Sequence, residues 1–189
     1  MKELQEKILK EGKVLPGNVL KVGNFLNHQL DVAFLMKMGA EIARLFEGTG
    51  VNKILTIEAS GIALAVAAAA HMNVPVLFAK KNSSSNMSAG KYTTQIASYT
   101  HQKVYNVVVN RDLLTADDRV LIIDDFLACG NAIIGLMDLV HQAGGEVVGI
   151  SVAIEKGYQG GGDQLRAQNI RVESLAIIEE MSETGIRFR

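Results

Sequence analysis

VLIIDDFLACGNA, at residues 120–132, carries the strongest structural signal in the chain. Its first four residues are apolar at every position, which is typical of a central parallel strand buried on both faces. Two adjacent carboxylates, Asp124 and Asp125, follow the apolar run, and a turn of small residues then leads into a predicted helix. Open α/β sheets bind ligands just beyond the carboxyl ends of their strands, so we expect the functional site at this point.

Strand and helix signals alternate on both sides of this stretch. Runs rich in β-formers at 53–58, 74–80 and 146–156 are separated by Ala- and Leu-rich helical runs at 61–71 and 131–144. This order predicts a parallel sheet with crossover helices. We therefore expect an α/β fold in which helices flank a mostly parallel sheet.

The chain before this alternation contains two predicted helices. Leu4, Ile8 and Leu9 lie on one stripe of a short amphipathic helix near the N-terminus. Asp31 is the predicted N-cap of a second helix, whose apolar residues recur at helical spacing until Gly48. The segment between the two helices has no clear period, and we expect it to be partly extended.

Three later segments depart from the alternation. Residues 81–91 read KNSSSNMSAGK, a composition that predicts a mobile loop. The runs at 92–100 and 103–110 predict two strands that pair antiparallel. Residues 117–118, both Asp, are expected as a solvated pair at a turn, and the polar tail at 179–189 carries no clear signal.

The composition fits one globular domain. The chain has 189 residues, and its 19 Lys and Arg against 20 Asp and Glu give a net charge of −1. This balance argues against binding nucleic acid through bulk charge. A single cysteine permits no internal disulfide, the polar N-terminus is unlike a secretory signal, and the longest apolar stretch, 61–70, is too short to cross a bilayer. We therefore expect a cytoplasmic protein with no nucleic-acid partner and no membrane partner.

The sequence predicts no metal site. Its four histidines are scattered, with no pair at metal-ligand spacing. Neither the GxxxxGK pattern of phosphate-binding loops nor the GxGxxG pattern of dinucleotide-binding folds occurs, so ATP hydrolysis and nicotinamide chemistry have no support.

The residues after the predicted central strand suit a phosphorylated sugar. Residues 128–132, which we call the phosphate loop, would present successive backbone N–H groups to an anion at a helix N-terminus. Asp124 and Asp125 are acceptors only, suited to two neighbouring sugar hydroxyls or to a cation bound with phosphates. Together they predict a ribose-5-phosphate site. The alternative is a solvated carboxylate pair before an ordinary helix start.

IIDDFLACGNA, at 122–132, resembles the phosphoribosyl-diphosphate motif of the type I phosphoribosyltransferase family. Three of its positions depart from that motif: Ala128 stands where the hypoxanthine/guanine enzymes carry Asp, and Cys129 and Asn131 replace commoner residues. The likeness extends along most of the chain, through LKVGNFLNHQLD (20–31), TIEASGIA (56–63), VLFAKK (76–81) and AIEKGYQGG (153–161). It implies a single domain whose parallel sheet carries a small N-terminal hood, from about residues 1–30, and a flexible loop at about 81–91.

The resemblance also implies roles for individual residues. It makes Asp124 and Asp125 the catalytic pair. The residues expected to bind phosphoribosyl diphosphate are Ser60, Lys81, Ala128, Cys129, Gly130, Asn131 and Ala132. Those expected to bind the purine base are Leu20, Asn27, Lys156 and Tyr158. Lys156 and Tyr158 would share one face if the strand continued past Lys156.

Each of these assignments has a plain structural alternative. Ser60 is also a suitable helix N-cap, and Asn27 a suitable turn residue. Lys81 and Lys156 would otherwise be surface lysines, and Cys129 a small residue filling a turn.

The function that the resemblance implies is transfer of the phosphoribosyl group from phosphoribosyl diphosphate to an oxopurine, with xanthine as the expected base. Guanine and hypoxanthine are the alternatives because all three carry a 6-oxo group. Mg²⁺ would be carried with the diphosphate substrate, and the family implies a homodimer. A regulator of the same fold that senses phosphoribosyl diphosphate without chemistry is the alternative from another class.

Overall fold

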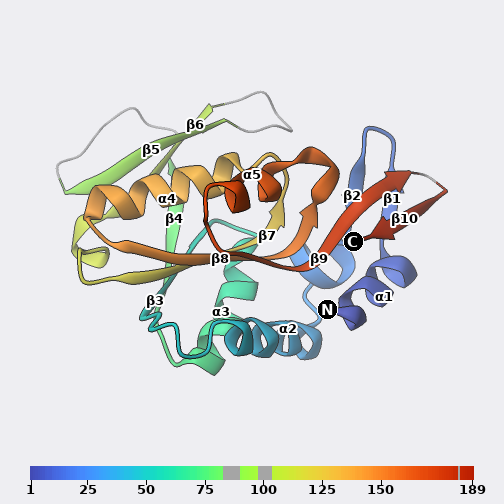
Figure 1. Ribbon diagram of the computed structural model, residues 1–189, viewed down its shortest axis with the longest axis horizontal. Helices are drawn as coiled ribbons and strands as arrows, with labels where there is room; N and C mark the ends of the chain where they lie inside the picture. The colour runs from blue at the N-terminus through green and yellow to red at the C-terminus, as the bar shows by residue number, and fades with distance from the viewer. Residues whose placement is uncertain (83–89, 98–103, 183) are drawn as a thin grey trace.

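The central element of the computed structural model is a mixed eight-stranded sheet (Figure 1). The structure describes residues 1–82, 90–97, 104–182 and 184–189. The strand order is β10-β9-β8-β7-β3-β4-β6-β5. β3, β4, β7, β8 and β9 are parallel neighbours, whereas β5, β6 and β10 pair antiparallel. The strands are β3 (Lys53–Ile57), β4 (Val76–Asn82), β5 (Lys91–Ala97), β6 (Val104–Asn110), β7 (Arg119–Leu127), β8 (Glu146–Lys156), β9 (Val172–Ser182) and β10 (Gly185–Phe188).

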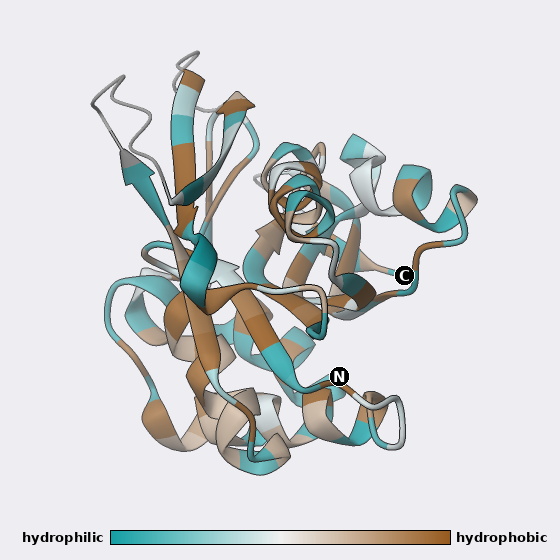
Figure 2. Cartoon of the chain, turned by 90° about the vertical axis from the view of Figure 1, so that its left-hand side faces the viewer, coloured by the Kyte–Doolittle hydropathy of each residue, from teal (hydrophilic) through white to brown (hydrophobic). Residues whose placement is uncertain are grey.

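Helices cover both faces of this sheet (Figure 1). α2 (Val32–Leu45) and α3 (Gly61–Met72) lie on one face, and α4 (Asn131–Ala143) and α5 (Gly161–Ala167) lie on the other. Figure 2 shows that the strands between them are largely hydrophobic. Within the described ranges, no helix is long and apolar enough to cross a membrane.

β7 is the buried central strand that its sequence predicts. Val120, Leu121, Ile122 and Ile123 are all 0% exposed. Leu121 and Ile123 belong to the apolar core beneath α2 and α3, whereas Val120 and Ile122 belong to the core beneath α4. Successive side chains of a strand point to opposite faces, so an unbroken apolar run is what a doubly covered strand requires.

The predicted hood segment lies beside β9 (Figure 1), and its buried apolar residues belong to the same core as those of α2 and α3. It consists of α1 (Lys2–Glu11), the hairpin of β1 (Lys13–Leu15) and β2 (Val19–Lys21), and a π-helical turn at Gly23–Asn27. Leu4 and Ile8 of α1 are buried, but Leu9 is 58% exposed, so its predicted place on the buried stripe is wrong. The N-terminal amino group donates to the Leu175 carbonyl of β9, which ties this unit to the sheet.

Other local predictions are confirmed with small changes of boundary. Asp31 caps α2, since its Oδ1 accepts from the Phe34 N–H at 3.1 Å, but the helix ends at Leu45, three residues before Gly48. β5 and β6 pair antiparallel as predicted. Of the predicted loop at 81–91, residues 83–89 lie outside the described residues.

The prediction that residues 117–118 form a solvated pair is wrong for Asp118. Asp118 is 8% exposed rather than solvated: its Oδ2 lies 2.7 Å from Lys53 Nζ and accepts from the Thr115 N–H at 2.8 Å. The polar tail, for which the sequence carries no clear signal, completes β9 and forms β10. β10 is an edge strand, and an edge strand needs little apolar surface, which explains its weak signal.

α2 and α3 pack closely enough that one position requires glycine. A Cβ added at Gly39 would lie 2.5 Å from the Ala67 carbonyl oxygen and 2.7 Å from the Ala68 nitrogen. Real Cβ atoms do not approach backbone this closely, so any side chain there must separate the helices. The spacing of α2 and α3 therefore depends on this glycine.

We predict that Gly39→Ala lowers the free energy of unfolding by about 2 kcal/mol through overpacking. Gly185→Ala is the matched control, because a Cβ at Gly185 meets nothing within 4 Å. Chemical denaturation of both variants checks this. Equal stability of the two would contradict the close packing.

Candidate active site

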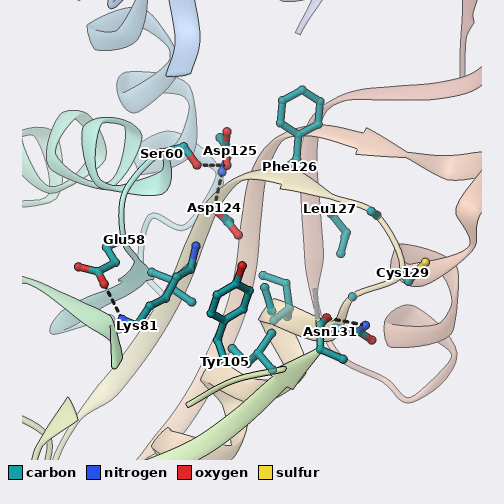
Figure 3. A pocket seen from close by; sticks show the side chains of 17 residues that line it. Glu58, Ser60, Lys81, Tyr105, Asp124, Asp125, Phe126, Leu127, Cys129 and Asn131 are labelled. Carbon is teal, nitrogen blue, oxygen red and sulfur yellow. Dashed lines mark hydrogen bonds between the residues drawn. The ribbon is translucent and has the colours of Figure 1, made fainter. Parts of the chain in front are cut away.

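A cleft of about 270 Å³ opens at the carboxyl ends of the central strands (Figure 3). The end of β7 and the start of α4 form one wall, and residues of β4, β5 and β6 form the other. Nine of the predicted site residues line it: Ser60, Lys81, Asp124, Asp125, Ala128, Cys129, Gly130, Asn131 and Ala132. The sheet thus brings together groups that lie far apart in sequence.

Asp125 is held by donors from two distant segments. Its Oδ1 accepts from the Ser60 hydroxyl at 2.9 Å, and its Oδ2 accepts from the Asn27 amide at 2.9 Å. Asp125 is only 6% exposed, and these two hydrogen bonds fix the orientation of its carboxyl group. Each oxygen keeps a further lone pair that can accept a hydroxyl of a ligand.

Asp124 is equally buried but has a different environment. Its Oδ1 accepts from the Asp125 backbone N–H at 2.9 Å. Burial raises the pKa of Asp124, and the neighbouring Asp125 raises it further, while Lys81 acts against both. A cation or a hydroxyl donor placed here would relieve the cost of the ionised form.

The phosphate loop joins β7 to α4. Gly130 has φ +89°, a left-handed conformation that favours glycine, and stands immediately before the helix. No side chain of the described residues caps α4, and the Asn131 side chain donates instead to the Ala97 carbonyl of β5 at 3.1 Å. The first N–H groups of α4 are therefore open to an anion.

The loop between β3 and α3, at residues 58–61, faces the acidic pair. Ser60 does not cap α3, so the alternative role as an N-cap is wrong: its hydroxyl bonds Asp125 instead. A Cβ at Gly61 would overlap the Thr56 hydroxyl and lie 2.8 Å from Asp124 Oδ1, so only glycine fits. The start of α3 thereby packs directly against Asp124.

Two further polar residues, Glu58 and Tyr105, also line the cleft, and Tyr105 is not predicted from the sequence. Glu58 Oε1 accepts from the Lys81 backbone N–H at 2.5 Å, which fixes β4 against the loop. Lys81 Nζ lies 5.8 Å from the centre of the Tyr105 ring. Figure 3 shows the side chains of Lys81 and Tyr105 pointing towards Asp124. Only the fold brings Tyr105 here, because its strand carries no motif.

The four residues predicted to bind the base are not on the cleft wall. Leu20 is 7% exposed within the apolar core. Lys156 Nζ donates to the Asn18 carbonyl at 3.0 Å and lies 5.9 Å from the centre of the Phe126 ring, and its burial lowers the pKa of the ammonium group. Asn27 and Lys156 therefore approach the cleft through Asp125 and Phe126.

The prediction that Lys156 and Tyr158 share one face is wrong. β8 ends at Lys156, and Gly157–Gln159 forms a turn of 3-10 helix. The alternation of an extended strand therefore stops between the two residues. Tyr158 is 36% exposed.

We predict that Asp124→Asn raises the melting temperature near pH 7 while turnover falls at least about a hundredfold. The raised pKa keeps Asp124 protonated in the native state at pH values where the unfolded chain is already ionised, so wild type loses stability as pH rises from about 4. Asparagine does not ionise and so avoids this loss of stability. The gain in melting temperature of Asp124→Asn over wild type should therefore vanish below about pH 4. The measurement is a series of melting curves against pH.

The exposed Asp117→Asn serves as the control for that series. It should leave the melting temperature unchanged at every pH. A stability gain for Asp124→Asn that is absent near pH 7, or one that is the same at all pH values, would contradict the assignment.

Comparison with known proteins places this cleft in context. The phosphoribosyl transferase domain family matches residues 22–185. Xanthine phosphoribosyltransferase from Bifidobacterium adolescentis is 55% identical, covering 100% of both chains. The protein of the same name from Lachnoclostridium phytofermentans is 51% identical, covering 96% of this chain and 94% of the relative.

Solved structures share the fold at lower identity. Adenine phosphoribosyltransferase from Rhodothermus marinus aligns with a TM-score of 0.74 and 22% identity, over 94% of this chain and 100% of the other. The adenine phosphoribosyltransferase from Giardia lamblia, complexed with 9-deazaadenine, aligns with a TM-score of 0.75 and 19% identity, over 91% of this chain and 96% of the other. The matched residues contain the acidic pair and the phosphate loop, and a relative aligned over the whole of both chains is 55% identical, so this chain belongs to the phosphoribosyl transferase domain family.

Proposed function

We propose that this chain is an enzyme that transfers the 5-phosphoribosyl group from phosphoribosyl diphosphate to xanthine. The products are xanthosine 5′-monophosphate and diphosphate. The observation that carries the reaction is the cleft, in which the acidic pair and the phosphate loop lie together. The choice of base is supported by full-length relatives, 50 to 55% identical, that are named xanthine phosphoribosyltransferase.

The ribose 5-phosphate would occupy the wall formed by β7 and α4. The open N–H groups of the phosphate loop and the first turn of α4 would bind the phosphate. Asp124 and Asp125 would accept the two ring hydroxyls, and Asp125 is already oriented by Ser60 and Asn27. Catalysis would come from positioning and electrostatics, with no covalent intermediate on the protein.

The diphosphate would leave towards the loop at residues 58–61. Lys81 points into the cleft there and would stabilise the charge that develops on the leaving group (Figure 3). Mg²⁺ would arrive with this substrate, since the cation usually takes one or two carboxylates together with phosphate oxygens. The two Asp side chains fit that pattern, and the described residues contain no cluster of three metal-ligating side chains.

The base would lie on the hood side of the acidic pair. Lys156 would donate to the 6-oxo group in exchange for the Asn18 carbonyl that it now contacts. The Asn27 amide uses one N–H on Asp125 and retains a second for the 2-oxo group of xanthine. Leu20 and Tyr158 remain proposed neighbours of the base. A homodimer is proposed on the family resemblance, and a cytoplasmic location on the single cysteine of the chain.

The function predicts turnover of oxopurines, with xanthine fastest. Initial rates with xanthine, guanine and hypoxanthine at saturating phosphoribosyl diphosphate test this directly. Failure to turn over any of the three bases would favour the alternative, a regulator that binds phosphoribosyl diphosphate without chemistry. A faster rate with guanine or hypoxanthine would keep the enzyme class and change the base.

We predict that Lys156→Ala raises KM about tenfold for every oxopurine, the loss expected for one charge-assisted hydrogen bond of about 1.4 kcal/mol. KM for phosphoribosyl diphosphate should stay within twofold of wild type, since the Lys156 ammonium donates to the Asn18 carbonyl of the hood and not to a group of the phosphate loop. Lys10→Ala, on the exposed face of α1, is the control. Steady-state kinetics with each substrate varied in turn provide the measurement, and an unchanged KM for xanthine would remove Lys156 from the base site.

A further inference from the structure

Glu155 is a carboxylate with no exposed surface, one residue before Lys156. Arg166 of α5 meets it with two N–H groups, Nη1 to Oε1 at 2.9 Å and Nη2 to Oε2 at 2.6 Å. The Ser174 hydroxyl of β9 donates to the same carboxylate. Burying a charged pair costs several kcal/mol, and apolar residues of similar volume often stabilise a core equally well. Stability alone therefore gives no reason for this pair.

The position of the pair suggests a functional reason, because α5 contacts both the phosphate loop and Glu155, the residue before Lys156. A Cβ at Gly161 would lie 2.6 Å from the Cys129 carbonyl carbon and 2.8 Å from the Gly130 nitrogen, so α5 begins directly on the phosphate loop. A Cβ at Gly162 would overlap the Glu155 carboxylate. Both contacts occur within one turn, and both require glycine.

The outer side of α5 is held more weakly. Asp163 accepts from Arg189 at 2.9 and 3.1 Å and from Arg166 at 3.1 Å. Asp163 is half exposed, and ion pairs in that setting contribute little. The two-pronged bond from Arg166 to the unexposed Glu155 thus joins α5 to β8, alongside the burial of Leu165 in the core.

We propose that Glu155 and Arg166 are a positioning pair that fixes α5, and through α5 sets the distance between Lys156 and the phosphate loop. This rests on the proposed function, which assigns the base to Lys156 and the phosphate to the loop. Neither member of the pair contacts substrate. Their contribution is to hold the two half-sites in register, so that base and ribose meet at the correct separation.

The test replaces the pair with apolar residues in Glu155→Met/Arg166→Met. Because the charges leave together, the melting temperature should stay within a few degrees of wild type. KM should nevertheless rise for xanthine and for phosphoribosyl diphosphate, each by about tenfold, since small misplacements of binding groups are costly. This double defect differs from that of Lys156→Ala, which is confined to the base.

Glu180→Met/Arg187→Met is the matched control, because it removes an exposed ion pair of β9 and β10 that lies away from the cleft. It should show wild-type kinetics. A folded Glu155→Met/Arg166→Met variant with wild-type KM for both substrates would overturn the proposal.

Arg166→Lys tests the positioning pair if the double variant does not fold. It keeps the buried charge but loses the two-pronged geometry. Both KM values should rise at least about threefold at an unchanged melting temperature, and unchanged values would overturn the proposal. Wild type is assayed alongside: if it does not turn over xanthine, the proposed function fails, whereas active wild type with unaffected variants refutes only the positioning pair.

Discussion

Asp124 and Asp125 stand side by side at the carboxyl end of β7, each 6% exposed, and much of the structure serves to make that arrangement tolerable. Two carboxylates withdrawn from water need donors or a nearby positive charge. Asp125 receives its donors from the hood, through Asn27, and from the start of α3, through Ser60. Asp124 accepts from the backbone N–H of its neighbour, and burial and the charge of Asp125 raise its pKa while Lys81 acts against both. A substrate that supplies hydroxyls would offset the cost of ionising Asp124.

Close backbone approaches place the surrounding elements around this pair. Gly61 lets α3 reach Asp124, and Gly161 lets α5 rest on the phosphate loop. The hood is joined to the sheet by the bonds from Asn27 to Asp125 and from Lys156 to the Asn18 carbonyl. Because these elements pack against one another around the cleft, a substitution in one wall should change the affinity for both substrates. The same contacts explain why the site lies at one end of the sheet, where several elements converge.

The parts that could be predicted from sequence are those whose signal is contiguous. The apolar run of β7, the acidic pair and the phosphate loop occupy thirteen consecutive residues, 120–132, and family resemblance supplied Ser60 and Lys81. The bonds that orient Asp125 span 65 and 98 positions, and no local pattern records them. Tyr105 was missed because only strand pairing brings it near Lys81. Tyr158 does not share a face with Lys156, because Gly157–Gln159 forms a turn where the prediction requires the strand to continue.

We infer that Asp125 links the hood and the loop before α3 into one binding site. A double-mutant cycle on the affinity for phosphoribosyl diphosphate, measured by calorimetric titration for Asn27→Ala, Ser60→Ala and the double variant, tests it most directly. Members of one hydrogen-bond network usually show coupling of about 0.5–3 kcal/mol. We expect a coupling in that range, with the second substitution costing less than the first. Strict additivity of the two effects would contradict the account.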